Sequence, residues 1–287
     1  FAANLTAKSD LKPAIETNAG LTAREAEIKG SFNAWWDAHR DSIKSLAGAE
    51  DPAALITLRD ELLSSFSDTL ESLAMLDPFT VRGIIAQFWN QSRFDFLTLM
   101  ARDTKGVVDA WRTSIVTALE DKGNKENPLD HKLVAFLMGD FVREIAELEA
   151  HKAELDAQIK AATSKPEEDE EEEDEAEPVD EAQIKRWKKE LSEVKKTLKA
   201  KQAQFTDEIN AGVDGLSPDE AAELLLKILH DDMQKILTRY IAAQRARIVA
   251  AFENWWDKYR VTLTEIEGAR SEATEKLAGF LKGLGYV

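Results

Sequence analysis

The sequence predicts an all-α protein, an elongated helical domain that carries a long antiparallel helical hairpin with coiled-coil-like spacing. Apolar residues recur at steps of three and four along most of the 287 residues. Ser, Thr or Asp stands before most of these periodic segments, as expected of helix N-caps. Two of the segments have heptad-like spacing and flank a strongly acidic tract, which favours a hairpin.

Residues 1–21 are expected to form an N-terminal linker, and residues 22–130 a helical subdomain. The capping-box pattern Thr22–Glu25 begins the first helix. Asp51–Pro52 and Asp77–Pro78 begin two more, because proline at the first helical position loses no intrahelical hydrogen bond. The stretch FDFLTLM that follows leaves a short strand and an extended connector open, whereas VVDAWRTSIVTAL favours a helix.

The hairpin is expected to have its first helix at 131–163, an acidic linker at 164–181 and its second helix at 182–213. Residues 167–181 carry twelve acidic side chains and no basic one, so self-repulsion predicts disorder in the linker. The apolar stripe shared by the two helices is narrow, which predicts that a helix from another chain completes its burial. The expected partner-binding residues are Phe141, Ile145, Leu148, Trp187, Leu191 and Val194.

The last part, 217–287, is expected to hold one long helix and a C-terminal helix. Ser217 and Pro218 begin an apolar pattern that persists to Arg260. An unbroken helix of this extent would be about 65 Å long. We therefore expect it to bend, to break or to extend beyond one compact core. The pattern TEIE near Thr264 begins the final helix.

Two similar segments, FNAWWDAHR at 32–40 and FENWWDKYR at 252–260, contain paired tryptophans. Helical spacing continues the apolar stripe through them, which favours a packing role over a ligand-stacking cage. We interpret both segments as packing elements. The aromatic residues expected to be structural are Trp35, Phe79, Trp89, Phe252, Trp255 and Tyr259.

Catalytic and metal-binding motifs are missing from this sequence. It has no cysteine, no HExxH, no Walker loop and no GxGxxG, and its four histidines are scattered. We expect no catalytic, cofactor-binding or metal-binding residue here. No apolar run is long enough to cross a bilayer, and cysteine-free composition fits a reducing cytoplasm. The start FAANLTAKSD lacks an initiator Met, so the chain is expected to be a fragment.

The formal net charge is −17, but without residues 167–181 the count is 42 acids against 37 bases, or −5. Local basic surfaces are therefore compatible with the composition. Residues 185–201 carry eight basic side chains and two glutamates. This basic stretch could contact phosphates or form a solvated flank of the coiled coil, and the solvated flank is favoured. The candidate nucleic-acid residues are Lys185, Arg186, Lys188, Lys189, Arg239, Arg245 and Arg247.

The C-terminal stretch FENWWDKYRVTLTEIEGARSEATEKLAGFLKGLGYV resembles the end of modification subunits of type I restriction–modification systems, which are adenine-N6 DNA methyltransferases. The block LLSSFSDTLESLAMLDPFTVRGIIAQFWNQ is similar to a second segment of that family, although only Asp95 represents the family's acidic pair. The residues that carry the second similarity are Leu76, Asp77, Pro78, Phe79, Val81, Phe88 and Trp89. Together the two blocks extend the resemblance over roughly residues 20–287.

The resemblance implies a non-catalytic assembly and DNA-docking region. The family's methyl-donor motif and its Asn-Pro-Pro-aromatic loop are absent, and Asn127–Asp130 lacks the aromatic residue. S-adenosylmethionine is expected for the parent enzyme only. The implied partners are the DNA-specificity subunit, DNA through the assembled complex and the restriction subunit, with no membrane. The alternative is a stand-alone coiled-coil scaffold or adaptor unrelated to DNA.

Overall fold

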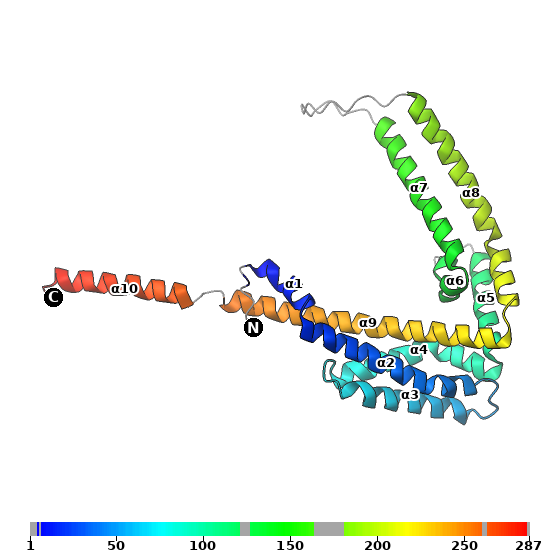
Figure 1. Cartoon of the computed structure of the whole chain (residues 1–287), viewed down its shortest axis with the longest axis horizontal. Coiled ribbons are helices and arrows are strands. Elements are labelled where there is room, and N and C mark those ends of the chain that lie inside the picture. Colours follow the sequence, from blue (N-terminus) through cyan, green and yellow to red (C-terminus); the bar gives the residue numbers. More distant parts are fainter. Residues whose placement is uncertain (1–4, 6, 121–126, 164–180, 260–262, 286–287) are drawn as a thin grey trace. The chain divides into compact units, whose positions relative to one another are not determined.

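The computed structural model describes residues 5, 7–120, 127–163, 181–259 and 263–285, and this part of the chain is helical without any strand (Figure 1). The all-α prediction is confirmed. In chain order the elements are η1 (Lys8–Asp10), α1 (Leu11–Glu16), α2 (Ala19–Ser45), α3 (Ala53–Glu71), α4 (Pro78–Ala101), α5 (Thr104–Glu120), η2 (Pro128–Asp130), α6 (Lys132–Leu137), α7 (Gly139–Thr163), α8 (Glu181–Asp214), α9 (Pro218–Tyr259) and α10 (Leu263–Gly283).

Three helix starts agree with the capping signals in the sequence. Asp51 Oδ1 accepts a hydrogen bond from the Ala53 amide at 2.9 Å, at the start of α3. Asp77 Oδ1 accepts one from the Thr80 amide at 2.9 Å, at the start of α4. At α9, the Ser217 amide donates to the Glu220 carboxylate at 2.9 Å, and the Ser217 hydroxyl accepts from the Glu220 amide at 3.3 Å.

Several boundaries differ from the expectations. The stretch 94–100 is neither strand nor connector, because α4 continues through it to Ala101. Phe96 and Leu99, which are three residues apart and share one face of the helix, are buried. The first hairpin helix begins at Gly139, since α6 ends at Leu137 and Met138 leaves helical geometry with φ −126° and ψ 33°. Within the expected N-terminal linker, residues 8–16 and 19–21 lie in helices. The acidic tract 164–180 lies outside the described residues, so its disorder stays a prediction.

The chain divides into two compact units, and the first consists of residues 1–39, 57–91 and 232–287. Its core is aromatic. The Trp35 ring meets Phe66 edge-on at a centroid distance of 5.1 Å, joining α2 to α3. The Trp36 ring meets Phe88 edge-on at 6.4 Å, joining α2 to α4. Phe32, Phe66 and Phe88 are fully buried, which explains the apolar stripes of these three helices.

The second unit consists of residues 40–56 and 92–231, and contains α5 to α8. Trp111 anchors its core, since the indole Nε1 donates to Asp95 Oδ1 at 2.6 Å. Lys132 Nζ binds the other oxygen of Asp95 at 2.6 Å and lies 4.4 Å from the centroid of the Trp111 ring. This polar cluster fixes α6 against α4 and α5, and so sets the base from which the α7–α8 hairpin extends (Figure 1).

Candidate partner-binding hairpin

The helices α7 and α8 form the antiparallel hairpin that the sequence predicts. The rings of Phe141 and Phe205 lie 5.9 Å apart near its base, and the Lys201 ammonium binds the Glu144 carboxylate beside them. Farther along, the Lys195 ammonium lies 3.6 Å from the Asp156 carboxylate. Residue numbers rise on α7 as they fall on α8, so the two helices run in opposite directions (Figure 1).

The apolar ridge that we predicted as a partner surface is covered unevenly by the hairpin itself. Ile145 and Val194 are buried, with exposed fractions of 2% and 8%. The other four members of the ridge are half-buried and remain accessible: Phe141, Leu148, Trp187 and Leu191. Two helices in contact leave the flanks of their shared stripe open, since full burial of such a stripe takes a third helix.

The seam of the hairpin includes residues that the sequence analysis did not select. Leu155 on α7 and Leu198 and Phe205 on α8 are buried at 3%, 8% and 3% exposure. They continue the heptad spacing of the ridge, which is the signal that could have identified them. An open cavity of about 500 Å³ lies where α6 meets α7, lined in part by Phe136, Phe141 and Glu208. Met138, where α6 ends, also lines this cavity, and the apolar spacing of four residues continues through the break.

The candidate phosphate-binding residues fall into two groups. Lys185, Arg186, Lys188 and Lys189 are exposed on α8, and none forms an ion pair within the described ranges. On α9, the Arg239 guanidinium donates to Gln87 Oε1 at 2.7 Å and lies over the Tyr240 ring.

Arg245 on α9 is committed to an acidic partner. Its Nε donates to Glu25 Oε1 at 2.7 Å, and Nη2 binds the other oxygen of the same carboxylate. Glu25 is buried on α2, and this hydrogen-bonded carboxylate raises the pKa of the Arg245 guanidinium. Arg245 is therefore engaged by Glu25 in this fold, and its contact with nucleic acid stays a prediction. Arg247 is exposed and forms no ion pair among the described residues.

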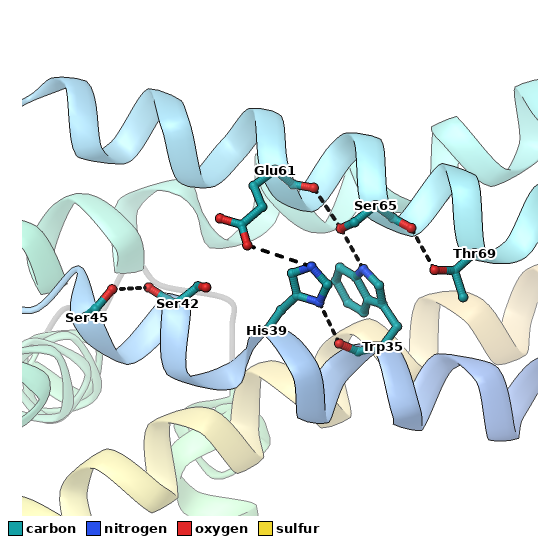
Figure 2. Close-up of polar contacts among 7 residues, drawn as sticks. All are labelled: Trp35, His39, Ser42, Ser45, Glu61, Ser65 and Thr69. Carbon is teal, nitrogen blue, oxygen red and sulfur yellow. Dashed lines mark hydrogen bonds and ion pairs between the residues drawn. The ribbon is translucent and has the colours of Figure 1, made fainter.

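The first tryptophan segment forms a polar contact between α2 and α3 (Figure 2). Trp35 Nε1 donates to Ser65 Oγ at 2.8 Å, and Ser65 Oγ donates to the Glu61 carbonyl at 2.7 Å. His39 Nδ1 lies 2.7 Å from the Trp35 carbonyl, while its Nε2 lies 3.8 Å from the Glu61 carboxylate.

The arrangement around His39 is structural rather than catalytic. A serine nucleophile needs a hydrogen bond to its base, but the Ser65 hydroxyl is engaged with Trp35 and with the Glu61 carbonyl. The carbonyl of Trp35 only accepts, so His39 Nδ1 carries the proton of the hydrogen bond. The cluster therefore fixes the Trp35 ring in its buried position.

The described residues of the two paired-tryptophan segments lie far apart along α2 and α9. Glu25 binds Arg245, while Lys8 binds Asp257 at 2.6 Å, so α2 and α9 run antiparallel in the first unit. From the Glu25–Arg245 pair, Trp35 lies about ten residues one way and Trp255 about ten residues the other way. The separation along the helix axes is about 30 Å at the α-helical rise. The segments occupy different places in the fold.

Two of the six aromatic residues expected to pack are in fact exposed. Phe79 is 85% exposed because it follows Pro78 in the first turn of α4, on the side away from the core. Trp255 is 55% exposed near the end of α9, where its ring lies 5.1 Å from that of Phe252. Trp35 is buried, as expected, and Trp89 and Phe252 are half-buried. The side chain of Tyr259 lies outside the described residues.

No other feature of the described residues suggests chemistry. No group of three or more histidine and carboxylate side chains there is arranged to hold a metal ion. Within the same ranges, every helix is too short or too polar to span a membrane. The site with the strongest functional character is therefore the half-covered ridge of the hairpin.

Comparison with known proteins identifies no relative of this chain. No protein-family model matches the chain, and no match is found among curated proteins or solved structures. The resemblance of residues 252–287 to the modification subunits stays the basis of a proposal.

Proposed function

We propose that this chain is a non-catalytic assembly and DNA-docking region of a type I restriction–modification adenine-N6 methyltransferase subunit. Its hairpin of α7 and α8 holds the DNA-specificity subunit by completing a three-helix or four-helix bundle. S-adenosylmethionine belongs to the parent enzyme, and DNA reaches this region in the assembled complex. The restriction subunit is a further partner of that assembly.

The half-covered ridge is the observation that carries this proposal. Trp187 and Leu191 on α8 and Leu148 on α7 keep part of their apolar surface exposed, and we call these three side chains the apolar seam. Burying apolar surface contributes about 25 cal/mol per Å², so a partner helix laid along the seam gains affinity from several side chains at once. The edges of the hairpin are already paired by Lys195–Asp156 and Lys201–Glu144, which leaves the apolar seam to the partner.

The test is co-purification of the chain with a cognate specificity subunit. The variant Leu148→Glu/Trp187→Glu places two charges on the seam and is expected to abolish the complex. The control Ala150→Glu/Ser192→Glu adds the same charges to exposed positions of the same helices and should retain it. Equal retention by both variants would contradict the proposed surface. If the wild-type chain self-associates and does not bind the specificity subunit, the result would instead support the stand-alone scaffold.

A further inference from the structure

A row of lysines follows the outer face of α8, and we call it the lysine stripe. Its members are exposed and share one side of the helix: Lys185, Lys188, Lys189, Lys196 and Lys199. Successive residues turn by about 100°, so the five fall within an arc of about 100° and extend over about 21 Å. The buried residues Val194 and Leu198 lie on the opposite side of the helix.

The charge of the lysine stripe is not neutralised within the described residues. Two acids of α7, Asp156 and Glu144, pair with Lys195 and Lys201, which lie at the edges of the hairpin. Glu190 turns away from the stripe by helical geometry and binds His151 Nε2 at 3.0 Å. Glu193 lies four residues after Lys189, and Glu181 lies four residues before Lys185, so both border the stripe, but neither forms an ion pair in the described part of the chain. None of the five lysines has an ion pair in the described part of the chain.

A local stripe of this kind acts on a ligand although the whole chain is acidic. Residues 185–201 alone have eight bases and two acids, or +6. Charges farther away than a Debye length, about 10 Å at 0.1 M salt, are largely screened. Lys188 and the later members of the stripe lie about 10 Å or more along the helix axis from Glu181, so a polyanion on that part of α8 meets the positive field of the stripe.

We propose that the lysine stripe binds the phosphate backbone of double-helical nucleic acid without reading its sequence. Lysine is a flexible point charge, and the stripe carries no Arg, Asn or Gln that would pair bidentately with base edges. It also carries no aromatic ring on which an unpaired base could stack, because Trp187 turns toward the hairpin seam. These two features favour a duplex over a single strand.

The remaining chemistry of α8 argues against a lipid surface. A helix that lies in a membrane interface inserts the apolar face opposite its charges. On α8 part of that face packs on α7, where Val194 and Leu198 are buried, so the helix cannot insert its whole apolar side. The inference deepens the DNA contact of the proposed function and rests on that function, but the lysine stripe is distinct from the apolar seam.

The experiment titrates the full chain into a fluorescently labelled DNA duplex of arbitrary sequence across a salt series. Each phosphate contact contributes about 0.9 to the slope of log K against log salt, so five contacts predict a slope near −4.5. The variant Lys188→Gln/Lys189→Gln/Lys196→Gln should reduce its magnitude by about 2.7. Glutamine keeps the helix propensity, and far-UV circular dichroism should confirm unchanged helicity.

The control Lys12→Gln/Lys29→Gln/Lys276→Gln removes the same charge from exposed lysines outside α8 and should keep the wild-type slope. An unchanged slope in the stripe variant, or a wild type that fails to bind the duplex at low salt, would overturn the proposal. Equal affinity for a single strand would overturn the duplex assignment. Binding to phosphatidylserine vesicles that the stripe variant loses would assign the stripe to a membrane instead. The uncharged seam variant Leu148→Ser/Trp187→Ser adds no negative charge beside the stripe and should bind DNA normally, which separates failure here from failure of the assembly proposal.

Discussion

The pair Glu25–Arg245 provides a quantitative test of how α2 and α9 hold together in the first unit. The Glu25 side chain is 7% exposed and the Arg245 side chain 33% exposed. Removing one partner of a fully buried pair costs about 3–5 kcal/mol, because the other charge is left uncompensated. Water reaches part of Arg245, so we reduce the expected cost of Arg245→Met to about 2 kcal/mol. Methionine keeps the apolar stem and the helix propensity of arginine.

The measurement is a double-mutant cycle by urea unfolding, followed by the fluorescence of the buried Trp35 and Trp36. Glu25→Gln is expected to cost about 1 kcal/mol, because the arginine left behind is partly solvated. The double variant should cost less than the sum of the single variants, with a coupling of about 1 kcal/mol. Arg247→Met is the matched control, since Arg247 is exposed on the same helix, and it should change stability by less than about 0.5 kcal/mol.

Two results would refute this reasoning. A coupling within about 0.3 kcal/mol of zero is inside the additivity expected of independent sites and would mean that the two side chains do not interact. A cost for Arg245→Met equal to that of Arg247→Met would leave Arg245 available to bind phosphate, as its position in the sequence first suggested.

Three further predictions concern single residues. Asp77 caps the start of α4, and hydrogen bonds from the Thr80 hydroxyl and then the Thr80 amide lower the pKa of its carboxyl group. The ionised Asp77 therefore stabilises the fold at pH values above the pKa of the unfolded state. Asp77→Asn should therefore lower the melting temperature at neutral pH, and the difference should shrink as pH falls through the carboxyl range. Trp35→Phe should destabilise the chain by about 1–2 kcal/mol in urea, because the Ser65 hydrogen bond and buried ring area are lost, whereas Trp255→Phe should stay within about 0.5 kcal/mol. Nitrogen-15 NMR of neutral His39 should show the proton on Nδ1, and an Nε2–H tautomer would contradict the hydrogen bond to the Trp35 carbonyl.

Capping signals predicted the starts of α3, α4 and α9, but not that of α2, which begins at Ala19 after Asn18 and not at Thr22. Asp51, Asp77 and Ser217 each satisfy orphan amides at the first turn, and such local hydrogen bonds depend on a few neighbouring residues only. The antiparallel hairpin was predictable for a similar reason, since heptad spacing is a local pattern. The break at Met138 was not, because it depends on how α6 packs against α5 and α8, which periodicity does not report.

Burial at helix ends was the least predictable property. Trp255 continues an apolar stripe in the sequence, yet it is exposed because a stripe is buried only where another element covers it. Arg245 showed the same limit, since its acidic partner Glu25 lies 220 positions away in the chain. Long-range pairs of this kind leave no periodic trace in one sequence. The apolar seam could be predicted from spacing, but the extent of its cover required the arrangement of α7 and α8.

The fold also separates two causes of the resemblance around residues 76–89. Leu76, Val81 and Phe88 are buried, and Asp77 caps α4, so packing and capping account for these matches. Any helix that starts in this way would share them. Phe79 has no such reason, because an aromatic ring that is 85% exposed adds nothing to the core. If the resemblance reflects a shared assembly, Phe79→Ser should weaken association with the partner subunit while leaving stability unchanged. If capping alone produced it, the variant should leave association unchanged as well, and the C-terminal block would then be the sole sequence support for the proposed family.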